Sequence, residues 1–550
     1  MRTAFRYSRR NTRPPYTFLL PLFFAPFFLC FCGKKPPVIH SVNPRIGTPG
    51  DVLTISGEYF GGERNESYVT IAGTAPTGSS YIAWRDDAVS LRIPESGDSG
   101  LVYVHVRGRK SNGALFSNQA VMPKPVQGSG ASAGPRIVSV HPQSGAPGSL
   151  LTISGSGFGG SREGGGVYFT WGGESGPHPE ERQAEMVEVS EPDFGYEYWS
   201  DQEIRVRVPD GAASGNIQVK TAQKLSRPLY FEVSGNPGTK TYRDKRSYTI
   251  SYSVDIQVDE ANNPNTLYLW VPQPVRSASQ RGVELLSRSG EPFMENHRGT
   301  DLFRFSNLTP KTGITVTHEY RIDVYTQETG VRHEAVRQDR ESPVTAQYTL
   351  PSPLVPSENA AVKARAAAIT GRERNPYLNA RAIYNWITRE IKTGTAVRRS
   401  VPEALESGTA DSYTAALLFC SLGRAAGIPA IPVAGILVNR NRLATRHYWA
   451  EFWIDGTGWI PVDPALGSGA APGGFNLRSD YASWYFGNLD NQRIAFSRAE
   501  TVLSPMTPRS RTSARTRDYA LQNLWEEAEG GLESYSSFWG DITITGIYAQ

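Results

Sequence analysis

Residues 408–430 read GTADSYTAALLFCSLGRAAGIPA, and residues 446–465 read RHYWAEFWIDGTGWIPVDPA. The first stretch predicts a buried helix that starts near Asp411 and is followed by a strand. The second predicts two strands joined by a tight turn. We therefore expect a helix N-terminus, carrying Ser412, to face a hairpin that carries His447 and Asp463. A nucleophile at a helix N-terminus lies in positive potential, an imidazole can take its proton, and a carboxylate can orient the imidazole.

These stretches resemble the transglutaminase-like superfamily, papain-like thiol enzymes in which a cysteine opens the helix. Three ordered motifs carry the resemblance: the helix end at 424–430, the His447-Tyr448-Trp449 box, and 458–464. The segment YFGNLDNQRIAFSR at 485–498 resembles the usual tail of bacterial members. The resemblance implies an α+β papain-like core over 351–500.

Two helices are expected to precede the core motifs. The first is capped by Ser357 and ends near Thr370, and the second follows the Asn375-Pro376 pair.

Serine stands where the family has its cysteine, because the position twelve residues before Arg424 is Ser412. A thiol ionises near pH 8.5, whereas an alcohol stays protonated and needs its base during attack. Cys420 lies eight residues further along the helix, about 12 Å away and rotated by about 80°, so we interpret it as a packed core thiol.

Three interpretations of the Ser412, His447 and Asp463 set remain open. The set is a working triad of an amide hydrolase or acyltransferase acting on exported protein or cell-wall peptide, or it is an inactive cleft that binds peptide or glycan. In the third interpretation the domain is only structural. The presence of both His447 and Asp463 argues against the third, since a structural domain has little use for a base and its orienting carboxylate.

Neighbouring residues have weaker functional signals. Tyr413 and Trp449 are candidates for a substrate cleft, although alternating tryptophans on strands are more often core residues. Glu451 shares a strand face with His447, and a solvated role is expected for it. The basic stretch PRSRTSARTR at 508–517 predicts a mobile, solvated loop. No metal or cofactor motif is found.

The first half of the chain contains a repeat. Residues 36–62 read PPVIHSVNPRIGTPGDVLTISGEYFGG and residues 134–160 read GPRIVSVHPQSGAPGSLLTISGSGFGG, which align without a gap. Strands closed by Pro-Gly and Gly-rich turns are typical of β-sandwiches. The strings resemble the IPT/TIG family of immunoglobulin-like domains, at 36–122 and 135–234, joined by a flexible linker at 123–134. Such modules bind partners or hold an enzyme away from a membrane.

Alternating strands continue over 241–350, and they predict a third β-sandwich before the core. His318 and His333 within it lack zinc-site spacing, so we interpret both as solvated strand or loop residues. Residues 501–550 are expected to form a C-terminal extension. The predicted fold is therefore multidomain, with N-terminal all-β immunoglobulin-like sandwiches followed by an α+β transglutaminase-like domain.

Length and composition agree with several turn-rich domains. The chain has 550 residues, with 54 glycines, 39 prolines and 11% aromatic residues. This mixture excludes coiled-coil and polar low-complexity proteins. The formal charge of +4 depends on five arginines in the first 31 residues, and the remainder carries −1. A nucleic-acid partner is therefore not expected.

Residues 1–32 have the anatomy of a signal peptide, with arginines followed by the apolar run TFLLPLFFAPFFLCFC. Cys30 and Cys32 end this run, as in a bacterial lipoprotein leader whose cysteine is lipidated, and Cys32 is the candidate. Phe31 departs from the small residue expected before that cysteine, and an ordinary secretory leader is the alternative. Either leader predicts an exported protein of the cell envelope, periplasmic or at the surface, and the lipoprotein type adds a lipid anchor in the membrane. Only Cys420 lies beyond the leader, so no disulfide can join the predicted domains.

Overall fold

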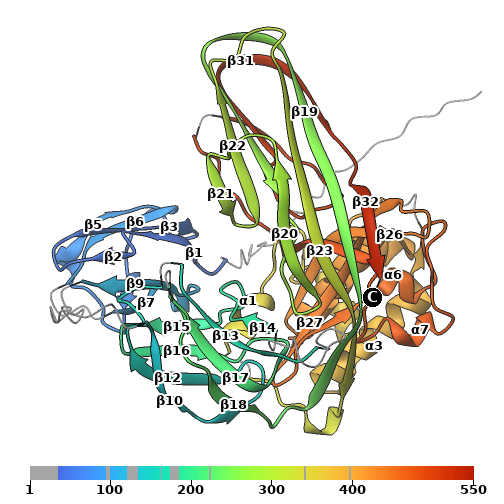
Figure 1. Cartoon of the computed structure of the whole chain (residues 1–550), viewed down its shortest axis with the longest axis horizontal. Helices are drawn as coiled ribbons and strands as arrows, with labels where there is room; N and C mark the ends of the chain where they lie inside the picture. The colour runs from blue at the N-terminus through green and yellow to red at the C-terminus, as the bar shows by residue number, and fades with distance from the viewer. Residues whose placement is uncertain are drawn as a thin grey trace, which may run out of the picture.

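The computed structural model describes residues 35–94, 99–119, 134–162, 164–173, 185–221, 224–339, 342–394, 398–508 and 510–549. The leader at 1–32, including Cys30 and Cys32, and nearly all of the linker at 123–134 lie outside these ranges. Two β-domains, a long sheet and an α+β core follow one another along the chain (Figure 1). Within the described ranges, no helix combines the length and apolar character needed to cross a bilayer.

The first domain is a sandwich of two sheets, with strand orders β1-β3-β6-β5 and β2-β9-β7-β4, and β8 added to β7. Buried Leu53, Ile55, Val102 and Phe116 belong to the core of this domain. Its elements are β1 (Val38–Asn43), β2 (Ile46–Gly47), β3 (Val52–Glu58), β4 (Tyr68–Ile71), η1 (Gly78–Ser80), β5 (Tyr81–Trp84), β6 (Ala88–Arg92), β7 (Gly100–Val106), β8 (Arg109–Lys110) and β9 (Ala114–Asn118).

The second domain repeats this architecture, with strand orders β10-β12-β16-β15 and β11-β18-β17-β13-β14. Its strands are β10 (Arg136–His141), β11 (Ser144–Gly145), β12 (Leu150–Ser156), β13 (Gly166–Trp171), β14 (Met186–Glu188), β15 (Tyr196–Trp199), β16 (Glu203–Arg207), β17 (Ala212–Lys220) and β18 (Leu229–Val233).

The sequence repeat is also a repeat of strand register. Val42 faces Ile55 in the first domain, and Val140 faces Ile153 in the second. The glycine of each LTISG string is required by close packing, because a Cβ at Gly57 would lie 2.0 Å from a backbone carbonyl oxygen of the paired strand. These features confirm the immunoglobulin-like organisation predicted for this half.

A single eight-stranded sheet follows the second domain, and it rises above the rest of the molecule in Figure 1. Its strands are β19 (Gly238–Pro272), β20 (Gln280–Arg288), β21 (Met294–His297), β22 (Thr300–Ser306), β23 (Gly313–Val331), β30 (Arg511–Ser513), β31 (Glu526–Trp539) and β32 (Thr543–Ala549). The long strand β19 folds back on itself, since the Tyr252 hydroxyl donates to the carbonyl of Pro272 at 2.7 Å. Residues of both arms of β19 share one core.

Two predictions are corrected by this sheet. Residues 241–350 do not form a separate sandwich of two sheets, because their strands belong to one sheet that encloses its core by bending. Residues 501–550 are not a separate extension, because β31 and β32 both pair with β19, as in the Arg246–Ala549 pair. Local alternation predicts strands but not distant partners.

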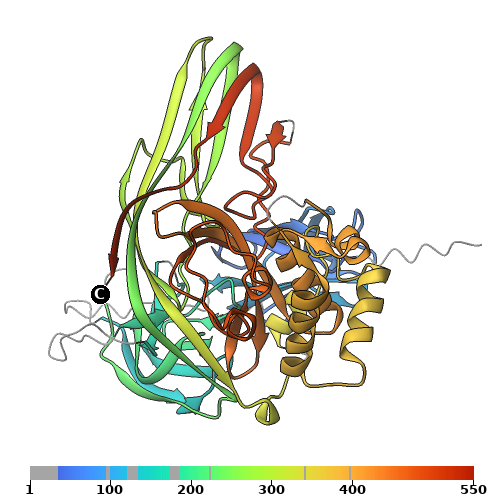
Figure 2. The same ribbon diagram turned by 90° about the vertical axis from the view of Figure 1, so that its right-hand side faces the viewer.

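The core that follows has an antiparallel sheet of order β28-β27-β26-β29 with helices on one face. Its strands are β24 (Lys392–Thr393), β25 (Thr409–Ala410), β26 (Ala430–Val438), β27 (Ala444–Ile454), β28 (Gly458–Val462) and β29 (Arg493–Arg498). Its helices, with those of the preceding connection, are η3 (His333–Ala335), α1 (Pro343–Tyr348), α2 (Ala360–Thr370), α3 (Pro376–Glu390), α4 (Val401–Ser407), α5 (Ser412–Ala425), α6 (Pro464–Gly467) and α7 (Tyr481–Trp484). Figure 2 shows the helices gathered on the side away from the long strands.

The buried face of α5 matches the apolar pattern of its sequence. Leu418, Phe419 and Leu422 share a core with Ala450 and Phe452 of β27.

The helix boundaries agree with the predictions except at one cap. Asn375 caps α3 through its side chain, with Pro376 in the first turn, as expected. The cap of α2 is Asn359 rather than Ser357, because the asparagine side chain accepts from the amides of Ala361 and Val362. Asparagine and serine are similarly good caps, so the sequence alone does not rank the two positions.

The second sandwich packs directly against the α+β core. The Trp459 indole N–H donates to Asp193 at 3.0 Å, and the Trp171 indole donates to the carbonyl of Ala278 at 3.1 Å. Lys240, at the start of the long sheet, binds Asp210 of the sandwich and also the carbonyl of Trp459. The contact of Trp459 fixes the second sandwich relative to the core, and the contact of Trp171 with Ala278 fixes it relative to the long sheet.

Candidate active site

The N-terminal end of α5 carries Ser412. Asp411 precedes the helix and its Oδ1 accepts from the amide of Thr414 at 2.8 Å. Ser412 is the first helical residue and is half-buried. At the other end, the guanidinium of Arg424 donates to the carbonyls of Ala430 and Leu350, which anchors the helix. The free amides and the helix dipole give the Ser412 end positive potential.

His447 and Asp463 are joined at the place where β28 ends. His447 lies on β27 opposite Gly435, and Asp463 directly follows β28. The imidazole Nε2 lies 2.8 Å from Asp463 Oδ2, and both side chains are almost completely buried. The other ring nitrogen, Nδ1, is therefore the one available to a reacting group. This is the orientation that a carboxylate gives to a general-base histidine.

Asp463 is held ionised by three partners. Its carboxylate accepts from His447, from the Arg493 guanidinium at 3.0 Å and from the Leu466 amide at 3.0 Å. Burial by itself would raise the pKa of Asp463, but the charge and hydrogen bond of His447, together with Arg493 and Leu466, hold it below its ordinary value. The Arg493 guanidinium also donates a hydrogen bond to the Asp490 carboxylate at 2.6 Å.

Ser412 lies on the element next to the histidine but forms no hydrogen bond with it. Tyr413 follows Ser412, and Tyr448 follows His447. The rings of these two tyrosines meet edge to face, with centroids 4.9 Å apart. The structure thus brings His447 and Asp463 into direct contact, whereas no side-chain hydrogen bond joins Ser412 to His447 among the described residues.

The other candidates near the site are largely packed. Trp449 is only 2% exposed and lies under the Arg493 guanidinium, so its assignment to a cleft surface is corrected to the core. Tyr413 is half-buried and carries Arg517 over its ring at 4.3 Å. Cys420 is fully buried, as expected, and burial raises the pKa of its thiol to about 12.

One further expectation of a solvated side chain is wrong, and one holds only in part. Glu451 is not solvated, because its carboxylate receives two hydrogen bonds from Arg498, at 2.9 and 2.7 Å. The described residues of the stretch at 508–517 are mostly exposed, as expected, but two of its arginines are held by carboxylates, since Arg515 binds Asp518 and Arg517 binds Asp411. Arginine-rich composition indicates charge, and it does not show which carboxylates lie nearby.

The site also depends on residues that sequence reasoning did not single out. Arg493 and Asp490 both lie within the 485–498 segment, whose likeness to the family tail was the available signal. That likeness gave no role for either residue.

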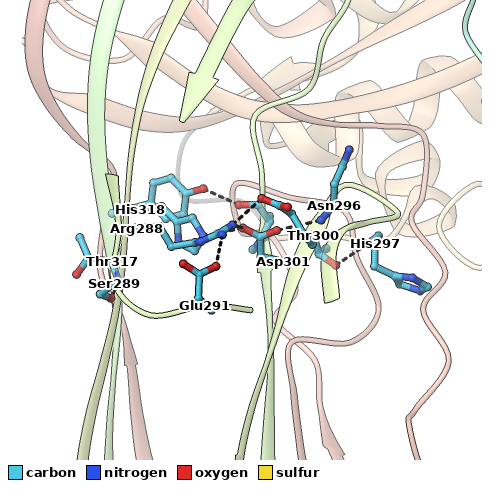
Figure 3. A network of polar contacts seen from close by, with 12 residues as sticks. Arg288, Ser289, Glu291, Asn296, His297, Thr300, Asp301, Thr317 and His318 are labelled. Atoms are coloured by element: carbon cyan, nitrogen blue, oxygen red, sulfur yellow. Dashed lines mark hydrogen bonds and ion pairs between the residues drawn. The ribbon is translucent and has the colours of Figure 1, made fainter. Parts of the chain in front are cut away.

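A second histidine–aspartate pair lies inside the long sheet (Figure 3). His318 Nε2 is 3.0 Å from Asp301 Oδ2, both side chains are fully buried, and Arg288 also binds Asp301 at 3.2 Å. The imidazole lies parallel to the rings of Tyr252 and Tyr320, with ring centroids 5.5 and 6.1 Å away. The solvated interpretation of His318 is therefore wrong, because strand alternation places it on the inner face of β23. Both side chains of this pair are fully enclosed within the long sheet and present no surface to a substrate, so we do not treat it as a second candidate site.

Comparisons with known proteins agree with this architecture. The transglutaminase-like superfamily model matches residues 363–464, and the IPT/TIG domain model matches 37–121 and 135–233. A cyclomaltodextrin glucanotransferase of Paenibacillus macerans is 33% identical over 91 residues, which are 16% of this chain and 12% of that protein. An uncharacterised protein of Haemophilus influenzae is 29% identical over 124 residues, which are 18% of this chain and 34% of that protein.

The chain thus spans only a minor part of these curated relatives. Among solved structures, a putative cysteine protease of Cytophaga hutchinsonii aligns over 57% of this chain and 92% of that chain, at 17% identity and a TM-score of 0.35. The matched family models and the sheet topology together establish that two IPT/TIG domains precede a transglutaminase-like superfamily domain in this chain.

Proposed function

We propose that Ser412, His447 and Asp463 form the active site of an amide hydrolase or acyltransferase, with serine in place of the family cysteine. The observation that carries the proposal is the buried hydrogen bond of 2.8 Å between His447 Nε2 and Asp463 Oδ2, next to the N-terminal end of α5. This bond fixes the tautomer with the proton on Nε2, and it directs Nδ1 to act as the base.

In the proposed reaction, Nδ1 of the neutral His447 takes the proton of Ser412 Oγ while Oγ attacks the amide carbonyl carbon. The negative charge on the carbonyl oxygen is stabilised by the first amides of α5, of which the Asp411 side chain engages only that of Thr414. The Nδ1 proton then passes to the leaving nitrogen as the C–N bond breaks. Water or an amine attacks the acyl-serine and restores the Ser412 hydroxyl, giving an acid or a new amide.

The substrate class that fits this chemistry is exported protein or cell-wall peptide. The leader at 1–32 supports export, and the two IPT/TIG domains support an extracytoplasmic protein that presents its core to a polymer or a partner. The formal charge of −1 beyond the leader offers no support for a nucleic-acid partner.

A binding cleft without turnover is the second candidate, for a peptide or a glycan. It is favoured by the serine at the cysteine position and by the lack of a Ser412–His447 hydrogen bond among the described residues. In this alternative, His447 and Asp463 serve to bind the ligand.

A serine-reactive fluorophosphonate distinguishes the two. For the full chain we expect labelling at residue 412 that is lost in Ser412→Ala and retained in Ser407→Ala, a nearby exposed serine at the end of α4. If the natural protein is not labelled and only Ser412→Cys incorporates a labelled amine, the proposal is wrong and the binding cleft stands.

The lipid anchor is a separate proposal, in which Cys32 is acylated and holds the protein in a membrane of the cell envelope. Metabolic labelling with a fatty acid should disappear in Cys32→Ala. Labelling that persists in this variant and disappears in Cys30→Ala would show that Cys30 carries the lipid.

A further inference from the structure

Residues 515–522, called the strap here, lie across the N-terminal end of α5. The carbonyl of Asp518 accepts from the Tyr448 hydroxyl at 2.7 Å, and Leu521 packs with Tyr448 and Ala416. The strap thus joins α5 to β27 at the level of Ser412. It belongs to the basic stretch and the region that follows, for which the proposed reaction provides no role.

Arg517 makes the closest contacts of the strap with this helix end. Its guanidinium binds the Asp411 carboxylate at 2.5 Å, the Thr414 hydroxyl at 3.3 Å and the carbonyl of Arg399 at 2.8 Å. It also lies over the Tyr413 ring, and only 18% of its side chain remains exposed. Both terminal nitrogens of the guanidinium therefore donate to acceptors, and its face lies on an aromatic ring.

The carboxylate that Arg517 binds directly precedes the proposed nucleophile. Asp411 Oδ1 caps the helix and Oδ2 receives Arg517. An unpaired carboxylate at this position would oppose negative charge on residue 412 and on the oxyanion, and it would cancel part of the helix potential. The cap is useful for the fold, whereas its charge is unfavourable for the reaction.

We propose that Arg517 is a positioning residue for the active site, which neutralises the Asp411 carboxylate and so preserves positive potential at residue 412. This inference rests on the proposed function for its catalytic meaning. The effect of Arg517 on the electrostatic potential at residue 412 does not depend on the proposed function, because it is the same whatever reaction the site performs.

Arg515 provides a matched control from the same strap. Its guanidinium binds Asp518 at 2.9 Å and lies over the Trp525 and Trp539 rings. These contacts are directed away from Asp411, although the charge of Arg515 and its position in the strap are similar to those of Arg517.

The test measures the pKa of the thiol in the Ser412→Cys variant of the full chain. The rate of alkylation by iodoacetamide is followed against pH by mass spectrometry of the peptide that contains residue 412, so other cysteines do not contribute. Adding Arg517→Gln should raise this pKa by about 1 unit, which slows alkylation about tenfold below the pKa. Adding Asp411→Asn as well should return the pKa to that of the parent variant. Arg515→Gln should leave it unchanged, and Arg517→Lys should change it less than Arg517→Gln.

Three results would overturn the role of Arg517: no shift with Arg517→Gln, a shift that Asp411→Asn does not reverse, or an equal shift with Arg515→Gln. A merely structural strap predicts the second result, because removing a charge would not restore a displaced helix end.

A parallel arm uses the natural serine and the fluorophosphonate. Arg517→Gln should lower the labelling rate about tenfold, and Asp411→Asn should restore it. If the natural protein is not labelled at all, the proposed function fails, whereas the thiol measurements still decide the role of Arg517. Faster labelling in Arg517→Gln would show that the strap inhibits, which contradicts the proposal.

Discussion

Replacement of Arg493 by methionine should lower the free energy of unfolding of the four-stranded sheet by about 3–5 kcal/mol, the usual cost of removing one partner of a buried ion pair. The guanidinium is 3% exposed and binds Asp463 at 3.0 Å and Asp490 at 2.6 Å. Methionine retains an unbranched stem over Trp449 but has no donor. Two buried carboxylates would therefore lose a cation that nothing replaces.

Hydrogen exchange of the β26–β29 amides in increasing urea measures this loss locally, independently of the IPT/TIG domains. Arg493→Lys is the matched control, because it keeps the charge but cannot bind both carboxylates in the same planar geometry, and a smaller loss is expected. A loss below about 1 kcal/mol for Arg493→Met, where a buried pair predicts several, would refute the assignment of Arg493 as the compensating charge.

The pH dependence of the stability loss in Arg493→Met gives a second check, because the pKa shift of Asp463 determines its direction. The pKa of Asp463 is lowered in the folded state, so its ionisation stabilises the fold above the unfolded pKa, about 3.9, and this contribution is lost as the pH falls through the folded pKa. Arg493→Met raises the folded pKa and reduces that contribution. The difference between the two proteins should therefore be largest near neutral pH and should shrink on acidification. A difference that grows below pH 4 would contradict the argument.

Three shorter predictions follow from the same geometry. Asp463→Asn should lower the rate of fluorophosphonate labelling by about 10⁴-fold, because the amide favours the wrong tautomer of the catalytic imidazole, and stopped-time labelling measures it. Cys420 should resist iodoacetamide in the folded protein at pH 8, since burial raises its pKa to about 12, whereas unfolding in urea should expose it at once. Gly467→Ala should destabilise the core, because the new Cβ would lie 1.9 Å from the Tyr384 hydroxyl, and thermal unfolding should show a lower Tm than for Gly473→Ala, which meets nothing within 4 Å.

The sequence predicted those parts of the molecule that depend on local patterns. The start of α5 at Ser412, the hairpin carrying His447 and the two sandwiches follow from caps, alternation and turns, which are properties of neighbouring residues. His318 shows the limit of that reasoning. Its inward position could be read from alternation along β23, but its partner Asp301 comes from another strand and has no sequence signal.

Contacts between distant segments account for most of the remaining differences. Arg493 and Arg517 both bind carboxylates of the active-site region. From the sequence, Arg493 was visible only as part of a segment that resembles the family tail, and Arg517 only as part of a basic stretch. The pairing of β31 and β32 with β19 likewise depends on tertiary packing. Sequence periodicity predicts which face of a strand or helix a residue occupies. Which residue it contacts on that face depends on the tertiary packing of distant segments.

The closure of the long sheet by β32 has a consequence for biosynthesis. Arg246 on β19 and its partner Ala549 are about 300 residues apart, so one edge of β19 stays open until nearly the whole chain has been translated. An unpaired edge of this length is a template for association with other chains, and pairing over such a separation is slow. The long sheet can therefore close only after β32 has been synthesised, and until then this edge of β19 is open to association with other chains.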